Sequence, residues 1–139
     1  MSLAFPDINV WLALSIEHSQ QQLALDWWRQ QAGGIAFCRF TQLGLLRLLT
    51  TAGVMDGKPL TMRQAWKTYD RFLNDERVEF IGEPPSIDAA FRGFSSATHA
   101  SPKLWADAYL LAFATDLGGI VVTFDRALAS RSRHSLLLA

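Results

Sequence analysis

The stretch of residues 101–125 constrains the fold of this chain more than any other part of the sequence. It opens with Ser101-Pro102, where serine can accept a backbone hydrogen bond as a helix N-cap and proline suits the first helical position. A mostly apolar run then predicts a helix, and Gly118-Gly119 ends it just before the β-branched residues 120–123. The stretch therefore predicts a helix followed at once by a strand.

One carboxylate lies among the apolar side chains of this predicted helix. At about 100° per residue, Asp107 shares a stripe with side chains that carry no charge. These are Leu104, Ala108, Leu111 and Thr115. Burial of an unpaired charge costs several kcal/mol. Asp107 must therefore be protonated, hydrogen-bonded to a partner such as the Thr123 hydroxyl, or bound to a cation.

Short apolar runs and helical patterns alternate along the whole chain. The runs predict strands at residues 3–5, 35–38, 78–81, 120–123 and 136–138. The periodic segments predict helices at residues 9–15, 19–31, 41–50, 61–73, 87–95, 104–114 and 126–130. This order predicts an α/β fold in which helices wrap both faces of a parallel sheet. At 139 residues, the chain is expected to form one domain, residues 1–139.

The charge of the chain excludes an overall electrostatic field that would attract nucleic acid. Its 13 basic residues balance 13 acidic residues, so a contact with RNA or DNA requires a local patch. The single cysteine, Cys38, cannot form an internal disulfide and lies in an apolar run, which favours a small core residue in a reducing compartment. No stretch approaches the ~20 apolar residues that span a bilayer. We therefore expect a cytoplasmic protein with no membrane segment.

Three aspartates are predicted to lie at one edge of the sheet. Asp7 closes the first strand, and Asp125 follows the strand at residues 120–123. Asp107 lies in the second turn of the helix that Ser101 is expected to cap. Ligands of parallel sheets gather at the carboxyl ends of the strands, where helix N-termini also point. We therefore expect the three carboxylates to meet at one rim.

The chemistry of such a rim follows from its charge. Clustered carboxylates repel one another, and a shared proton or a hard divalent cation is the usual reason to keep them together. Mg²⁺ or Mn²⁺ prefers oxygen ligands, and a water bound to it can attack a phosphodiester while the cation offsets charge on the phosphate. Zinc is not expected, because His18, His99 and His134 are isolated from one another.

Each acidic position also has a simpler interpretation. Asp7 can form a turn or a helix cap, although Asn9 is also placed to cap the helix that follows. Asp125 is a suitable N-cap for the short helix after it. Asp116 lies about 180° around the helix from Asp107, so we expect it to point away from the site.

Three short motifs stand in order along the chain. They are Asp7-Ile8-Asn9 after an N-terminal strand, Trp105-Ala106-Asp107-Ala108 in a late helix, and Val122-Thr123-Phe124-Asp125-Arg126 near the C-terminus. Together they resemble the marks of the PIN-domain family, particularly its VapC-type toxins, and the likeness spans the whole chain. The resemblance implies a three-layer α/β/α sandwich with a central, mostly parallel sheet. It also implies a ribonuclease that depends on Mg²⁺ or Mn²⁺, forms a homodimer and is inhibited by a cognate antitoxin.

The same resemblance implies roles for individual residues. Asp7, Asp107 and Asp125 match the catalytic carboxylates at the metal site, and Asp7 and Asp107 are the expected metal ligands. Asn9 matches a residue that supports the site. The Thr123 hydroxyl matches one that helps to order it.

Gln42 departs from the family pattern, since many members have a glutamate at the start of the helix after the second strand. Glutamine keeps an oxygen that can ligate a metal or support a metal-bound water, but it lacks the negative charge. We therefore expect weaker cation binding, with one metal rather than two. Alternatively, Gln42 simply faces solvent in the first helical turn.

Basic and aromatic residues are candidates for contacts with RNA or protein. Arg126, which is adjacent to Asp125, and Arg39 are candidates to contact a phosphate backbone, although an ordinary solvated charge is the simpler interpretation of each taken singly. The five tryptophans are more typical of a core than of base stacking. Because a domain of this size has limited interior, some of them could instead cover a homodimer or antitoxin surface.

The sequence supports one function best and leaves another open. The first is a metal-dependent endoribonuclease that acts as the toxin of a type II toxin-antitoxin pair. The second is a catalytically weak RNA-binding or regulatory module that retains the PIN fold, which Gln42 and the neutral net charge favour. A phosphatase-like enzyme with Asp7 as nucleophile is discounted, because no Gly-x-Gly-x-x-Gly loop follows the first strand.

Overall fold

The computed structural model describes residues 2–139, and within them five strands form a single sheet. The strands are β1 (Ala4–Pro6), β2 (Ile35–Phe37), β3 (Val78–Phe80), β4 (Ile120–Thr123) and β5 (Ser135–Leu137). Their order across the sheet is β3-β2-β1-β4-β5, and every neighbouring pair is parallel. The predicted parallel sheet is confirmed.

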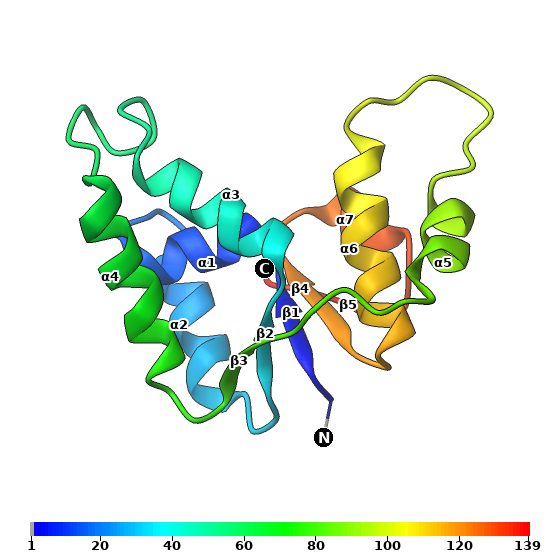
Figure 1. Ribbon diagram of the computed structural model, residues 1–139, viewed down its shortest axis with the longest axis horizontal. Helices are drawn as coiled ribbons and strands as arrows, with labels where there is room; N and C mark the ends of the chain where they lie inside the picture. The colour runs from blue at the N-terminus through cyan, green and yellow to red at the C-terminus, as the bar shows by residue number, and fades with distance from the viewer. Residues whose placement is uncertain (1) are drawn as a thin grey trace.

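Helices cover both faces of this sheet (Figure 1). They are α1 (Ile8–Ser15), α2 (Gln21–Gln30), α3 (Arg39–Leu49), α4 (Met62–Leu73), α5 (Ile87–Phe94), α6 (Leu104–Asp116) and α7 (Arg126–Ser130). None of these helices, which include every helix of residues 2–139, is long and apolar enough to cross a lipid bilayer. The helices α1 to α4 pack on one face and α5 to α7 on the other. The predicted three-layer α/β/α sandwich is therefore confirmed.

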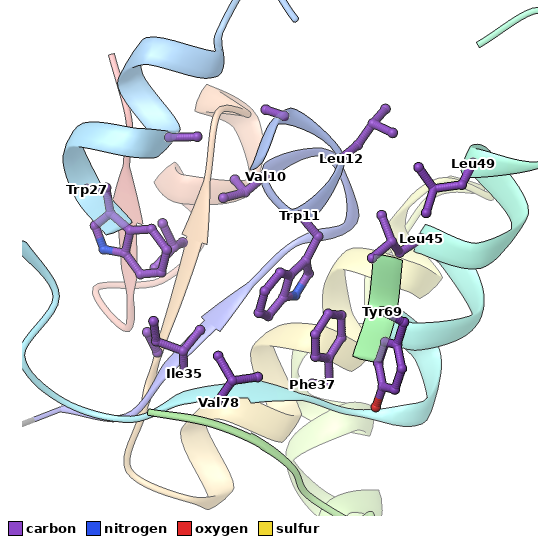
Figure 2. Packing of buried hydrophobic residues seen from close by; sticks show 14 of the residues in the cluster. Val10, Trp11, Leu12, Trp27, Ile35, Phe37, Leu45, Leu49, Tyr69 and Val78 are labelled. Atoms are coloured by element: carbon purple, nitrogen blue, oxygen red, sulfur yellow. The ribbon is translucent and has the colours of Figure 1, made fainter. Parts of the chain in front are cut away.

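An aromatic core holds the layer of α1 to α4 on the sheet (Figure 2). The Trp11 indole of α1 is fully buried and stacks on the Phe37 ring of β2, with the ring centroids 3.7 Å apart. Phe72 and Tyr69 of α4 meet these rings edge-on, 4.9 Å from Trp11 and 4.8 Å from Phe37. Burial of such rings contributes several kcal/mol. The core therefore fixes α1, and with it the residue at which α1 begins.

The opposite layer is built around α6, which is buried on almost every side over its middle. Its buried residues are Ala108, Leu110, Leu111, Ala112, Phe113 and Ala114. A helix that is apolar all round belongs in the interior of a protein. Cys38 is also fully buried on this side of the sheet, as predicted for a small core residue. The N-terminal turn of α6 is the more exposed part of the helix, and Asp107 lies there.

The strand order creates a topological switch point between β1 and β4. The chain leaves β1 toward β2 on one side of it, and β4 later enters on the other side. Pro6 of β1 pairs with Val122 of β4, so Asp7 is the next residue along β1 and Thr123 the next along β4. This register places Asp7 and Thr123 side by side at the switch point. Ligands of open α/β sheets bind at such a point, so a site is expected there.

Close packing at the opposite end of these two strands fixes their register. The Gly119 position lies against β1, and a Cβ atom there would come within 2.7 Å of the Leu3 carbonyl oxygen and 2.8 Å of the Phe5 ring. The Ile120 N–H donates a hydrogen bond to the same Leu3 carbonyl, at 2.9 Å. Only glycine fits this approach, so the Gly118-Gly119 break that the sequence indicated also sets how β4 lies along β1.

Two predicted helix caps are wrong, and both corrections affect the candidate site. Asp7 caps α1, not Asn9, because the Asp7 carboxylate accepts the first free N–H groups of the helix. Ser101 does not cap α6, because the Leu104 N–H donates to the Ser101 carbonyl oxygen at 3.0 Å and forms a turn before the helix. Asp107 consequently lies in the first turn of α6, not the second, close to the positive end of the helix dipole.

Candidate active site

A pocket of about 530 Å³ lies at the carboxyl ends of β1 and β4, where α1, α6 and α7 begin. Its lining residues come from both helical layers. They are Asp7, Ile8, Asn9, His18, Gln20, Phe40, Ala106, Asp107, Leu110, Phe124, Asp125 and Leu128. The pocket thus brings together all three predicted aspartates and Asn9, although 100 residues of chain separate the first two aspartates.

Asp7 has a hydrogen-bond donor on each carboxylate oxygen. Its Oδ1 accepts the backbone N–H groups of Asn9 at 3.0 Å and Val10 at 3.2 Å, and its Oδ2 accepts the Thr123 hydroxyl. Burial raises the pKa of the Asp7 carboxyl, and the hydrogen bonds from Thr123, Val10 and Asn9 offset part of that rise. Asp7 therefore lines the pocket and also caps α1. The interpretation of Asp7 as a site residue and its interpretation as a helix cap are both compatible with the structure.

Asp107 is half-buried and accepts no hydrogen bond from any side chain or backbone group of residues 2–139. Burial first, and the negative charge of Asp125 second, raise the pKa of the Asp107 carboxyl, while the Arg131 guanidinium lowers it. The suggested hydrogen bond from the Thr123 hydroxyl to Asp107 is wrong, because that hydroxyl donates to Asp7. Both oxygens of Asp107 remain available to a ligand in the pocket.

Asp125 and Thr123 form the β4 side of the site. Asp125 caps α7 through its Oδ1, which accepts the N–H groups of Ala127 at 2.8 Å and Leu128 at 3.2 Å. Its own N–H donates to the Thr123 hydroxyl oxygen at 3.0 Å. Thr123 is fully buried. Its hydroxyl accepts from the Asp125 N–H and donates to the Asp7 carboxylate, so it connects the two residues.

Asp107 interacts electrostatically with both of the other aspartates of the pocket. Its charge raises the pKa of Asp7, and the charge of Asp125 raises the pKa of Asp107. All three carboxylates stand in the cap or first turn of a helix, where the dipole stabilises a negative charge by about 0.3–1 kcal/mol. The helix dipoles therefore offset part of the electrostatic repulsion between the three carboxylates.

Gln42 and Arg39 lie together outside the pocket lining. The Gln42 Oε1 accepts a hydrogen bond from Arg39 Nη1 at 2.6 Å, and the Arg39 guanidinium lies 4.7 Å from the centroid of the Phe80 ring. Gln42 is only 6% exposed, so the interpretation that it faces solvent is wrong. Gln42 is not among the residues that line the pocket with the three carboxylates. Arg126 follows Asp125 on an exposed position but does not line the pocket either.

Sequence reasoning did not assign several residues of the pocket wall to the site, among them His18, Gln20, Phe40 and Phe124. Phe124 could have been found, because it stands between Thr123 and Asp125 in a motif already assigned to the site. His18 and Gln20 belong to the connection between α1 and α2, far from any aspartate in sequence. No local pattern marks that connection, and only the fold brings it to the end of β4.

The oxygen donors of the pocket suit a hard cation that keeps most of its water. Within residues 2–139, no group of three or more His, Cys, Asp or Glu side chains stands close enough to enclose a metal ion by itself. Mg²⁺ normally uses one or two carboxylates and retains several waters. The free oxygens of Asp107, the second oxygen of Asp125 and the Oδ2 of Asp7 fit that mode of binding.

Relatives of known sequence agree with this architecture. Residues 4–133 match the family model described as the PIN domain. The chain is 42% identical to "Ribonuclease VapC41" of Mycobacterium tuberculosis over 128 residues, which cover 87% of this chain and 88% of that protein. It is 34% identical to "Ribonuclease VapC44" of the same organism, with 91% and 88% covered. Two curated relatives thus align along most of the chain.

Two solved structures share the fold at low sequence identity. VapC20 of Mycobacterium tuberculosis, a sarcin-ricin loop cleaving toxin, superposes with a TM-score of 0.65 at 14% identity, covering 91% of this chain and 93% of that one. VapBC2 from Rickettsia felis, bound to a DNA fragment from its promoter, gives a TM-score of 0.61 at 15% identity, covering 97% and 96%. The sequence matches and the shared fold agree: this chain belongs to the PIN domain family and is a VapC-type member of it.

Proposed function

We propose that this chain is a metal-dependent endoribonuclease and the toxin of a type II toxin-antitoxin pair. The observation that carries the proposal is the convergence of Asp7, Asp107 and Asp125 on one pocket at the switch point of the sheet. The name of the relative at 42% identity, a ribonuclease, supports the same reaction class. RNA is accordingly the proposed substrate, and phosphodiester hydrolysis the proposed reaction.

Asp7 and Asp107 are the proposed ligands of Mg²⁺ or Mn²⁺, and Asp125 the third catalytic carboxylate. A bound divalent cation supplies a more acidic water and offsets the negative charge that develops on a phosphate. The chain itself orients the carboxylates: Thr123 and the α1 backbone hold Asp7, and the α7 backbone holds Asp125. Asp107 keeps both oxygens free, and Asn9 adds an uncharged amide at the wall.

Two arginines are proposed to contact the RNA backbone outside the pocket. Arg126 is exposed and directly follows Asp125. Arg39 is exposed and precedes Phe40, which lines the pocket. Their guanidinium groups would offset the repulsion between the acidic pocket and the phosphates on either side of it.

A cognate antitoxin and a second copy of the chain are the proposed protein partners. An apolar groove of about 380 Å³ lies between α3 and α4. Leu43, Met62 and Trp66 line it and are 59%, 74% and 47% exposed. Exposed apolar side chains gathered in this way are typical of a protein contact. The solved relative from Rickettsia felis is itself a VapBC assembly, which supports an antitoxin partner for this chain.

Cleavage of RNA by the purified protein, separated from any co-purified inhibitor, tests the proposal. Total cellular RNA is incubated with the protein and Mg²⁺ or Mn²⁺, and fragments are resolved by gel and mapped by end sequencing. We expect discrete cleavage that EDTA abolishes and that Asp107→Asn removes. Cleavage that persists in EDTA, or is equal in the Asp107→Asn protein, would contradict the proposed mechanism.

The alternative function, a catalytically weak RNA-binding or regulatory module, is favoured by one observation. Gln42 pairs with Arg39 and adds no charge to the pocket, so the site holds three acidic side chains and not four. Isothermal titration calorimetry distinguishes the two functions. RNA binding without divalent-cation binding, in a protein that gives no fragments, would favour the module over the nuclease.

A further inference from the structure

His18 is a pocket residue that the three carboxylates do not account for. It lies in the connection between α1 and α2, is half-buried, and is one of the residues that line the acidic pocket. The imidazole stacks on the Phe124 ring, with centroids 6.3 Å apart and an interplanar angle of 12°. Its Nδ1 accepts the backbone N–H of Gln20 at 3.0 Å. Two separate contacts therefore fix the orientation of this ring.

The hydrogen bond to Nδ1 also assigns the tautomer of His18. A ring nitrogen that accepts an N–H cannot carry a proton itself, so the neutral imidazole bears its proton on Nε2. No acceptor within residues 2–139 takes a hydrogen bond from that Nε2. Nε2–H is thus a donor without a protein partner within residues 2–139, and it belongs to a residue that lines a pocket rich in acceptors.

A phosphate entering this pocket needs donors, because the lining carboxylates offer only acceptors. Three lining side chains can donate: Asn9, His18 and Gln20. Of these, His18 is the one whose donor is oriented by both a ring contact and a hydrogen bond. Orientation before binding reduces the entropic cost of holding a ligand in place. His18 also belongs to the layer of α1 to α4, whereas Asp107 comes from α6 in the other layer.

We propose that His18 is a phosphate-binding residue, whose Nε2–H donates a hydrogen bond to a non-bridging oxygen of an RNA phosphate held in the acidic pocket. The inference rests on the proposed ribonuclease function and adds to it a residue from the opposite wall. Phe124 and the Gln20 backbone are then positioning groups that aim the imidazole. A substrate phosphate is thereby held between the His18 donor on one side and the aspartate site on the other.

Two substitutions separate the two nitrogens of His18. In His18→Asn the amide oxygen can take the place of Nδ1 and still accept the Gln20 N–H, but nothing remains at the Nε2 position. In His18→Gln the longer side chain returns an N–H donor near the Nε2 position. If His18 acts only by holding the Gln20 backbone, His18→Asn should affect RNA binding and cleavage less than His18→Gln does. If His18 binds a phosphate, His18→Gln should affect them less. His99→Asn, on an exposed loop outside the pocket, is the matched control.

The experiment measures RNA binding and cleavage separately, with the full chain. Binding is measured by filter retention of labelled total cellular RNA on Asp107→Asn protein in EDTA, so that no cleavage intervenes. We expect His18→Asn to weaken binding by about 10- to 100-fold, the loss of one hydrogen bond to a charged group. His18→Gln should lose less than His18→Asn. In cleavage assays with Mg²⁺ on proteins that retain Asp107, the same order should appear in KM more than in kcat.

The outcomes distinguish failure of the inference from failure of the proposed function. Active protein in which His18→Asn and His18→Ala bind and cleave RNA as the His99→Asn control does would overturn the inference alone. Equal losses in His18→Asn and His18→Gln, accompanied by a lowered Tm, would assign His18 a structural role and also overturn it. Protein that neither binds nor cleaves total RNA, with His18 intact, would overturn the proposed function and the inference together.

Discussion

Asp7 and Asp107 line the same pocket, yet their carboxylates differ in hydrogen bonding. Asp7 accepts two backbone N–H groups and the Thr123 hydroxyl, and it caps α1. Asp107 accepts no hydrogen bond within residues 2–139 and lies beside the negative charge of Asp125. Burial raises the pKa of both carboxyls, but at Asp107 no hydrogen bond offsets that rise.

The difference separates two kinds of functional residue. Asp7 contributes to the fold and to the site at once, so its loss affects both. Asp107 contributes nothing to the fold that its side-chain contacts reveal, and its charge is a cost to stability. Residues kept against stability are expected where a ligand provides the missing partner. A substitution of Asp107 is therefore expected to reduce function without reducing stability.

The largest expected effect is on cleavage by Asp107→Asn. The change keeps the size of the side chain and removes the charge, so we expect cleavage to fall by about a hundred- to a thousand-fold, the scale for loss of one preorganised electrostatic group. The unfolding temperature should stay equal or rise. Asp116→Asn is the matched control, because Asp116 lies at the far end of the same helix and bonds to Ser86. Comparable losses in both variants would contradict the assignment of Asp107.

A smaller effect, on stability, should single out Asp7. Asp7→Ala removes the α1 cap and leaves the buried Thr123 hydroxyl without its acceptor, which together cost about 1–3 kcal/mol. Asp107→Ala should cost nothing or stabilise. Urea denaturation followed by circular dichroism measures both. Asp7→Asn keeps a capping oxygen and should therefore lose much less free energy of unfolding than Asp7→Ala. Equal destabilisation by Asp7→Ala and Asp107→Ala would contradict the proposed difference between the two carboxylates.

A pH dependence of stability follows from the raised pKa values. The folded carboxyls bind protons at a higher pH than the unfolded ones, whose ordinary pKa is 3.8. The free energy of unfolding contributed by these groups therefore falls as pH rises through the folded pKa, and is recovered on acidification toward the ordinary value. Asp75, whose pKa its partner Arg77 lowers, acts in the opposite direction. The difference in Tm between wild type and Asp107→Asn isolates the effect and should shrink as the pH falls.

Mg²⁺ or Mn²⁺ should relieve the same cost at neutral pH. Either cation is expected to raise the Tm of the wild-type protein by a few degrees, and to have a much smaller effect on Asp107→Asn. Differential scanning fluorimetry with and without EDTA measures the shift. A shift of equal size in both proteins would place cation binding elsewhere.

The smallest effect is expected from Gln42→Glu. Gln42 pairs with Arg39 and does not line the pocket, so the new charge should form an ion pair there. Because the pair lies outside the pocket lining, we expect the cleavage rate to change by less than about fivefold, which corresponds to about 1 kcal/mol in the activation free energy. Gln42→Leu serves as its uncharged comparison. A large gain in Mg²⁺ affinity in Gln42→Glu would mean that the side chain reaches the carboxylates.

The sequence predicted the layers, the strand positions and the pocket aspartates, because each depends on local pattern. Apolar runs mark β1 and β4, and the alternation of strands with helices favours a parallel sheet. The caps were mistaken where two neighbours compete: Asn9 and Asp7 both suit an N-cap, and only the backbone geometry decides. His18 could not be predicted at all, since its place depends on how the α1–α2 connection folds over the end of β4.

The tight approach of Gly119 to Leu3 has a consequence for which substitutions the candidate site tolerates. Because that contact sets how far β4 slides along β1, it also sets whether the Thr123 hydroxyl reaches the Asp7 carboxylate at the other end of the strands. A slip by a single residue would turn Thr123 to the opposite face of the sheet. A substitution at Gly119 can therefore disrupt the pocket from the far end of the strands, while every acidic residue of the site stays in the sequence.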